Sequence, residues 1–204
     1  DYVETVFTAS THDSILFFTN LGKVYVRKGY RIPEAGRSAR GQNIVNIIPT
    51  DPGEKVSAMI AGRGVTEDNY LVFVTRNGTV KRTAQSAFKN IRSNGIRALS
   101  LDEGDELISV LQTTGEDKIL LATHDGMAIC FAETDARAMG RDAVGVRGIR
   151  LREGDYVVGA GIAAEGAAIL SITENGYGKR TDVGEYSVQN RGGMGLKNYN
   201  VTDK

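Results

Sequence analysis

Apolar residues gather in short runs along this chain, and each run ends at a polar turn. The runs at residues 13–19, 70–75, 118–123 and 168–173 each lead to a turn glycine, and residues 23–27 alternate between charged and apolar after the first. Three of the turns carry Asn77-Gly78, Asp125-Gly126 or Asn175-Gly176. Such dipeptides tolerate positive φ angles and are typical of type I′ turns, so the pattern predicts a β-hairpin at each of the four places.

The hairpins belong to a repeat of about fifty residues, a period typical of propellers and solenoids. Each repeat has a glycine in its hairpin turn, a threonine three residues before that glycine, and a second glycine further along. These positions hold Thr19, Gly22 and Gly41, then Thr75, Gly78 and Gly95, then Thr123, Gly126 and Gly145, and finally Thr173, Gly176 and Gly195. We therefore expect one repeat domain over residues 1–204, with units at about 1–53, 54–104, 105–154 and 155–204.

Further strands are predicted at residues 56–60, 107–111, 145–151 and 157–162, and looser segments separate them from the hairpins at 28–40, 84–94, 133–144 and 182–194. No segment has the spacing of a convincing amphipathic helix. Four strands per unit predict an all-β, propeller-like fold of four-stranded antiparallel blades. Residues 61–69 interrupt the rhythm and are expected to form an exposed loop.

Composition fits a soluble globular domain, with 41% hydrophobic and 25% charged residues. A single cysteine excludes a disulfide framework within the chain, and no apolar run is long enough for a membrane span, so we expect a cytoplasmic protein without a membrane partner. The chain lacks an initiator Met and ends where a fifth unit would start, and we therefore expect it to be part of a longer protein.

Net charge is formally zero, yet the two signs occupy different positions of the repeat. Acidic residues cluster where each unit closes, around Glu54, Asp105 and Asp155, and we interpret them as solvated turn charges rather than as a Ca²⁺ site. Basic residues recur after the first glycine and around the second, and repeated cations of this kind suit DNA phosphates, with the second glycine allowing close approach of a backbone. The candidate DNA-binding residues are Arg27, Lys28, Arg37, Arg40, Lys81, Arg82, Arg92, Arg97, Arg137, Arg141, Arg147, Lys179, Arg180, Arg191 and Lys197.

Catalytic and cofactor sites find little support. Residues 159–164 and 176–181 superficially match dinucleotide and phosphate-binding loops, but neither precedes a predicted helix, so a strand and a hairpin are the better interpretations. His124 lies beside a turn, and Cys130 lies in an apolar strand with no activating base. We expect no catalytic residue, no metal site and no cofactor in this chain. The third unit has Ile129 and Cys130 where other units have basic pairs, so it should contribute less to binding after its hairpin.

The segments at residues 37–46, 145–151 and 175–181 resemble the C-terminal domain of bacterial DNA gyrase A, and the resemblance covers the whole chain. It implies a β-pinwheel whose blades exchange strands and whose basic perimeter wraps and bends duplex DNA with little sequence preference. It also implies partners in the rest of the gyrase A polypeptide and in the ATPase polypeptide, gyrase B, with ATP and Mg²⁺ used by the holoenzyme for negative supercoiling.

The family's signature box, Gln-Arg-Arg-Gly-Gly-Lys-Gly, is not intact here. Its nearest match is a degenerate box made of Gln189, Asn190, Arg191, Gly192, Gly193, Met194 and Gly195. We expect the principal box to lie upstream, and a family domain to have about six blades rather than four. Two alternatives stay open: the related C-terminal domain of topoisomerase IV, and a propeller scaffold that binds proteins, which would present a hydrophobic or mixed-charge face.

Overall fold

The computed structural model describes residues 3–62 and 69–202 and is built almost entirely of β-strands. The first two repeats contain β1 (Ser14–Thr19), β2 (Lys23–Lys28), β3 (Val56–Gly62), β4 (Tyr70–Thr75), β5 (Thr79–Ala84) and β6 (Ile96–Arg97). The others contain β7 (Leu107–Thr113), β8 (Lys118–Thr123), β9 (Met127–Ala132), β10 (Val146–Arg147), β11 (Val157–Ile162), β12 (Ala168–Ile172), β13 (Gly178–Asp182) and β14 (Leu196–Lys197). Short 3-10 helices in these described ranges lie between strands: η1 (Gly29–Arg31), η2 (Ile44–Asn46), η3 (Gln85–Phe88), η4 (Glu133–Asp135) and η5 (Val183–Glu185).

The strands form successive antiparallel sheets, which are the blades of the fold. Three sheets have four strands, in the orders β3-β1-β2-β6, β7-β4-β5-β10 and β11-β8-β9-β14, and β12 pairs with β13 in a fourth. All-β architecture and a hairpin in each repeat are therefore confirmed. The predicted strand at residues 145–151 is confirmed only at Val146–Arg147. The expected loop at residues 61–69 falls mainly outside the described residues.

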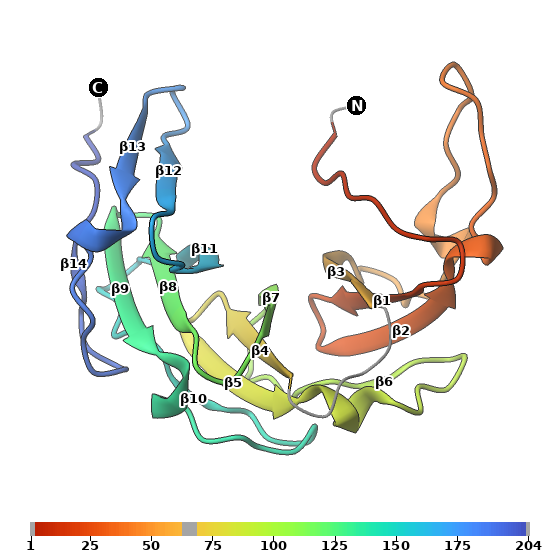
Figure 1. Cartoon of the computed structure of the whole chain (residues 1–204), viewed down its shortest axis with the longest axis horizontal. Helices are drawn as coiled ribbons and strands as arrows, with labels where there is room; N and C mark the ends of the chain where they lie inside the picture. The colour runs from red at the N-terminus through yellow and green to blue at the C-terminus, as the bar shows by residue number, and fades with distance from the viewer. Residues whose placement is uncertain (1–2, 63–68, 203–204) are drawn as a thin grey trace.

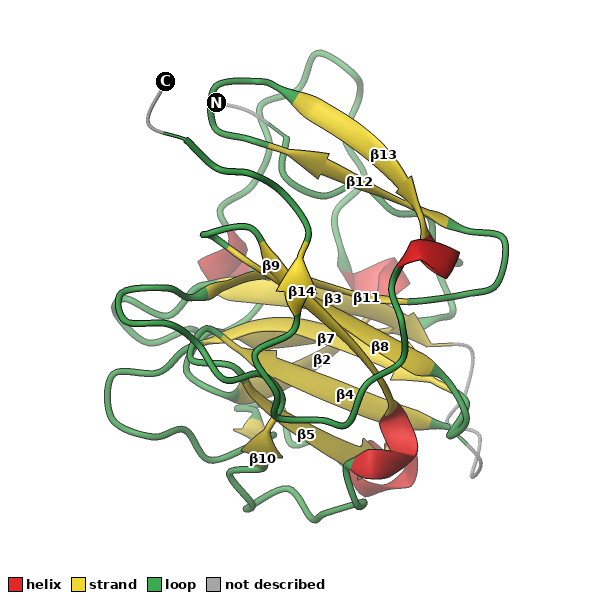
Figure 2. Cartoon of the chain, turned by 90° about the vertical axis from the view of Figure 1, so that its left-hand side faces the viewer, coloured by secondary structure: helices red, strands yellow, loops and turns green. Residues whose placement is uncertain are grey.

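The blades stand side by side along an open arc (Figure 1). Strands β3, β7 and β11 line its inner side, while β6, β10 and β14 lie on its outer perimeter. Figure 2 views the arc from the side of β14 and shows the 3-10 helices beside the strand ends. Among the described residues, no helix is long and apolar enough to cross a lipid bilayer.

Every hairpin turn is built in the same way, with the threonine three residues before the turn glycine accepting two hydrogen bonds. The backbone N–H of Gly78 donates to Thr75 O at 3.0 Å, and the N–H of Thr79 donates to Thr75 Oγ1 at 3.1 Å. Only the turn glycine has a positive φ, 84° at Gly78, and no other residue type among the described residues does. The prediction of type I′ turns is therefore wrong, because such a turn needs a positive φ at both central residues.

Apolar side chains of neighbouring blades meet face to face, so the core consists of layers between blades. Phe18 of the first blade packs edge-on against Phe73 of the second, with ring centroids 5.6 Å apart, and Phe88 closes the same cluster. Further layers join the second blade to the third and the third to the fourth. Because each interface buries both partners, the order of the blades along the arc is fixed by packing.

Candidate nucleic-acid interface

The outer edge of each four-stranded blade is supplied by the following repeat. After its 3-10 helix the chain crosses back, so β6 pairs with β2, β10 with β5 and β14 with β9. Each crossing ends on the turn glycine of the receiving hairpin, as when Gly148 N–H donates to Gly78 O at 2.7 Å. The perimeter of the arc is thus a chain of crossing segments rather than the hairpins themselves.

The second glycine of the repeat marks where this crossing passes closest to the neighbouring blade. A Cβ at Gly145 would lie 2.4 Å from Val80 O, and one at Gly195 would lie 2.3 Å from Ala128 O. Both glycines also have positive φ. The space beside these two glycines is therefore filled by the backbone of the neighbouring strand of the protein. This corrects the expectation that the second glycines allow close approach of DNA. Gly41 differs, with open space around its Cβ position.

Three cations occupy one matched position on the perimeter. Arg97 pairs in register with Lys23, Arg147 with Thr79, and Lys197 with Met127. Each partner directly follows the turn glycine of its blade. All three cations are exposed, and each belongs to an outermost strand of the arc (Figure 1). The structure thus presents one such cation on each of the first three blades along a curved edge.

Most of the other predicted residues are also at the surface. The exposed ones are Lys28, Arg37, Arg40, Arg92, Arg137, Lys179 and Arg180, while Arg27, Arg82, Arg141 and Arg191 are half-buried. A groove of about 720 Å³ between the first two blades gathers the basic residues Arg27, Lys28, Arg31, Lys89 and Arg92.

Sequence reasoning missed Arg31 and Lys89, which line this groove. Lys89 stands as far after its turn glycine as Arg137 does, so matching on the first glycine would have found it. Arg31 has no basic counterpart in the other repeats and offered no such signal.

Lys81 is not part of this surface, and its assignment to DNA is corrected by its burial. Its side chain is 1% exposed, and Nζ donates to the carbonyl oxygens of Ala98, Gly140 and Arg141 at 2.6, 3.1 and 2.9 Å. Burial, together with the nearby charge of Arg141, lowers the pKa of Lys81 to about 8 despite the carboxylate of Asp142. All three donors are used, so Lys81 holds a crossing segment in place.

Arg82 and Arg191 also donate hydrogen bonds to backbone carbonyl oxygens of crossing segments. The guanidinium of Arg82 donates to Ala136 O at 2.8 Å and lies 4.7 Å from the ring centre of Tyr70, with its side chain 12% exposed. Arg191 donates to the carbonyl oxygens of Asp135 and Arg147. Both arginines fasten a crossing segment, and little of Arg82 remains available to a phosphate.

The degenerate box runs along the perimeter and joins two crossing segments. Gln189 N–H donates to Cys130 O, Gly192 N–H donates to Gly148 O, and Arg150 N–H donates to Gly193 O, each at 2.8 Å. The box therefore links β9 of the third blade to the segment that covers the second. Its glycines serve this backbone contact in the structure.

The recurrent acids are internal braces, which corrects their interpretation as solvated charges. Glu54, Asp105 and Asp155 are 7%, 8% and 9% exposed. Asp105 Oδ1 accepts the N–H of Asn77 at 2.9 Å and that of Glu106 at 2.8 Å, so it fixes the hairpin turn of its own blade. Asp155 makes the equivalent contacts with the N–H groups of Asp125 and Tyr156, so this carboxylate likewise fixes the turn of its own blade.

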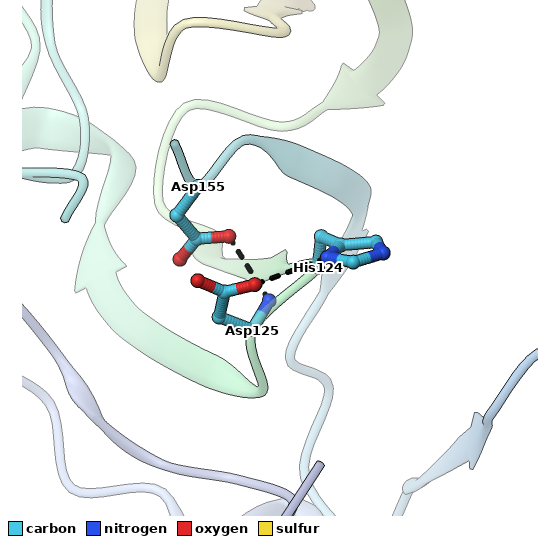
Figure 3. Close-up of side chains that lie close together, drawn as sticks. All are labelled: His124, Asp125 and Asp155. Atoms are coloured by element: carbon cyan, nitrogen blue, oxygen red, sulfur yellow. Dashed lines mark hydrogen bonds and ion pairs between the residues drawn. The ribbon is translucent and has the colours of Figure 1, made fainter. Parts of the chain in front are cut away.

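In the third blade the same position brings together three possible metal ligands, contrary to the expectation that no such set could be assembled (Figure 3). His124, Asp125 and Asp155 each offer a ligand atom, and these atoms lie within 4.8 Å of one another. The hydrogen bond to Asp125 raises the pKa of His124. Cys130 is buried as predicted, and burial raises the pKa of its thiol.

Comparison with known proteins agrees with this architecture. The model of one family, the DNA gyrase C-terminal domain, beta-propeller, matches residues 13–62, 69–114, 117–164 and 168–204. DNA gyrase A from Staphylococcus aureus strain NCTC 8325 / PS 47 is 48% identical over 207 residues, as is the protein of the same name from strain MRSA252. These matches cover 100% of this chain and 23% of each relative, so the chain spans under a quarter of their length.

Two solved structures share the fold over 92% of this chain. The C-terminal domain of DNA topoisomerase IV has a TM-score of 0.83 and 32% identity, with 58% of that structure covered. The DNA gyrase A C-terminal domain has a TM-score of 0.79 and 29% identity, with 60% covered. Both similarities extend through all four repeats found here.

Proposed function

The chain belongs to the DNA gyrase C-terminal domain family, and on that premise we propose that it binds duplex DNA along its outer perimeter and bends it. The observation that carries this proposal is the matched position of Arg97, Arg147 and Lys197 on three successive outermost strands. Cations at regular places along an edge meet phosphates, which also recur regularly along a duplex.

Because the perimeter is curved, a duplex that binds along it must bend. The perimeter cations lie on the convex side of an arc, so a duplex that contacts several of them must follow that arc (Figure 1). Bending about 20–30 base pairs by roughly 40–90° costs on the order of 1–6 kcal/mol. Contacts from more than one blade are needed to offset this cost. The groove between the first two blades extends the basic surface beyond the edge itself.

Sequence preference should be weak. The proposed contacts are made by lysine and arginine side chains to phosphates, and the described strands of the perimeter offer no recognition helix to the major groove. The interface therefore positions DNA without reading it.

In the whole protein we propose that this domain supports ATP-dependent negative supercoiling, together with the rest of gyrase A and the ATPase polypeptide gyrase B in the bacterial cytoplasm. DNA cleavage and nucleotide hydrolysis, with their Mg²⁺, are assigned to those other parts. Removing residues equivalent to 1–204 from the full-length polypeptide should abolish negative supercoiling while ATP-dependent relaxation persists. Loss of both activities would contradict this division of labour.

Binding is tested by titrating a labelled random-sequence duplex with the 204-residue chain and following fluorescence anisotropy. Affinity should fall linearly in log salt, with a slope of about −0.9 per neutralised phosphate, and a scrambled duplex of equal length should compete equally. A flat salt response would favour the protein-binding scaffold. Failure of the scrambled competitor would overturn the sequence-independent interface.

A role in topoisomerase IV is the second candidate, favoured by the structural similarity to that enzyme's C-terminal domain. The two candidates make opposite predictions for the full-length protein. Gyrase activity produces negative supercoils from relaxed circles, whereas a topoisomerase IV role predicts relaxation and unlinking without supercoiling. The sequence preceding Asp1 offers a direct check, because an intact signature box there would favour gyrase.

A further inference from the structure

A groove of about 720 Å³ lies between the first two blades, and none of the matched perimeter cations lines it. One wall is formed by β2 and η1, and the other by η3 and the segment that follows it toward β6. The volume falls within the range of about 300–1,000 Å³ that is usual for ligand-binding clefts. A DNA duplex, whose major groove alone is about 12 Å wide, is too broad to enter it. The occupant must therefore be slimmer than a duplex.

The charge of the groove is of one sign. Its lining contains five basic residues and, among the described residues, no aspartate or glutamate. The five are Arg27, Lys28, Arg31, Lys89 and Arg92. Arg27 is fixed in place, because its Nε donates to Ile47 O at 2.8 Å and its guanidinium reaches Ser93 O on the opposite wall at 3.3 Å. A concave surface lined by positive charge concentrates the field and attracts a polyanion.

An exposed aromatic ring distinguishes this groove from a simple basic patch. Tyr30 lines it with 60% of the residue exposed, and it stands in η1, close in sequence to Lys28 and Arg31. Its backbone is anchored, since the Tyr30 N–H donates to Thr11 O at 2.8 Å. Further apolar lining comes from Leu16, Val26, Phe88 and Ile91. An unstacked base has apolar faces that such a ring can cover, whereas the bases of a duplex already cover one another.

We propose that this groove binds a single strand of nucleic acid, with one base stacked on Tyr30 and the adjoining phosphates held by Arg31 and Arg92. A positively charged groove combined with an aromatic platform is the usual arrangement for binding single strands without sequence preference. An acidic peptide would use the cations but leave the ring without a partner. The inference goes beyond duplex binding at the perimeter and does not depend on it.

Oligothymidine is the direct probe, because it cannot pair with itself to form a duplex. Fluorescence anisotropy of a labelled oligomer of about 4–16 nucleotides should report binding by the 204-residue chain, weakening in log salt with a slope of about −0.7 per neutralised phosphate. Oligouridine of the same length tells whether RNA or DNA is preferred, and binding of either supports the site. An abasic oligomer keeps the phosphates but lacks the bases, so it should bind more weakly. Binding of neither strand, equal affinity of the abasic oligomer, or equal competition by polyglutamate would overturn the proposal.

Tyr30→Ala separates stacking from charge, because it leaves every cation of the groove in place. It should weaken oligothymidine binding roughly 5- to 150-fold, the range expected for one stacked base, while Tyr30→Phe should bind as the wild type does. Tyr177→Ala is the matched control, since Tyr177 is 69% exposed in the turn between β12 and β13. It should leave the affinity unchanged. Wild-type affinity in Tyr30→Ala, or an equal loss in Tyr177→Ala, would overturn the groove as the site.

Affinity for a duplex distinguishes this groove from the perimeter. Tyr30→Ala should leave the affinity for a duplex of equal length unchanged, whereas Arg97→Glu with Arg147→Glu should weaken duplex binding far more than oligothymidine binding. Unchanged duplex affinity in the perimeter variant would count against the proposed function alone. A parallel loss of both ligands in Tyr30→Ala, with folding confirmed by circular dichroism, would overturn a separate groove for single strands.

Discussion

The ammonium group of Lys81 donates a hydrogen bond of 2.9 Å to the carbonyl oxygen of Arg141, sixty residues further along the chain. It thereby ties β5 of the second blade to the segment that the third repeat sends across it. Two further carbonyl oxygens, of Ala98 and Gly140, complete its coordination. A residue that looks like a surface cation in the sequence is a buried strut between repeats.

Replacing Lys81 with Met should therefore lower the free energy of unfolding by on the order of 3 kcal/mol, because three carbonyl oxygens lose their donor in a buried place. Chemical denaturation measures the change. The control is Lys179→Met, which alters the lysine at the same position of the fourth repeat, where the side chain is exposed. That loss should stay under about 1 kcal/mol. Equal losses would contradict the strut.

Stability should also depend on pH through Lys81. Its pKa is lowered to about 8 in the folded chain, from 10.5 ordinarily, chiefly by burial. Between these values the unfolded chain binds more protons than the folded one, so the free energy of unfolding should rise with pH. The difference between wild type and Lys81→Met should accordingly grow from pH 8 to about 10.5. A constant difference over that range would show that Lys81 stays charged in the folded state.

Local signals were enough to predict the hairpins but not the contacts between repeats. Thr75 and Gly78 lie within one turn, so their spacing in the sequence reports their contact directly. Lys81 and Lys179 have the same repeat position, yet only Lys81 is covered by a crossing segment, and the covering residues lie far away in sequence. The short strands β6, β10 and β14 have too few residues for a periodic pattern, so their pairing with the preceding blade could be inferred only from the family.

The burial of the recurrent acidic residues Glu54, Asp105 and Asp155 was not predicted, for a related reason. An acidic residue in a turn is usually solvated, and nothing near Asp105 in sequence reveals that the turn at Asn77 folds over it. The cluster around His124 and Asp125 was missed because its third member, Asp155, is supplied by a different turn. In both cases the two residues in contact are far apart in the sequence, by 28 residues for Asn77 and Asp105 and by 30 for Asp125 and Asp155.

Asp105→Ala should destabilise the second blade by about 1–3 kcal/mol, because the N–H groups of Asn77 and Glu106 lose their acceptor. Thermal or chemical unfolding measures the effect. Glu103→Ala, in the same turn but exposed, should change stability by no more than about 0.5 kcal/mol. If the two variants were equally stable, Asp105 would be a surface charge after all.

Charge reversal on the perimeter should weaken DNA binding without unfolding the chain. In the double variant Arg97→Glu and Arg147→Glu, two exposed cations on outermost strands become acidic, and the salt slope should flatten by about 0.9 for each phosphate that is no longer neutralised. Anisotropy titrations at several salt concentrations measure both quantities. Lys55→Glu with Lys118→Glu makes the same change in net charge at exposed residues off these strands. Equal weakening by the two pairs would mean that net charge alone governs binding.

Bending should require DNA to be held at both ends of the row of perimeter cations. Energy transfer between dyes at the two ends of a duplex reports the bend, and it should rise only for duplexes that reach several blades, because one blade cannot offset a cost on the order of 1–6 kcal/mol. Arg97 and Lys197 lie on the first and third crossing strands, with Arg147 between them. Removing the cation at either end shortens the path that the duplex follows around the curve. Removing the middle cation reduces affinity, but the duplex is still held at both ends.

Single reversals at these three positions separate bending from affinity. Arg97→Glu and Lys197→Glu should each reduce energy transfer in the saturated complex, while Arg147→Glu should lower affinity by a similar factor and leave the transfer in the saturated complex nearly unchanged. All three side chains are exposed and occupy the same register position, so the comparison holds local structure constant. A saturated complex whose long duplex stays straight would reject bending and leave only electrostatic attachment. An equal drop in energy transfer for all three variants would contradict a special role of the two outer positions. It would mean that all three cations contribute equally to the bend.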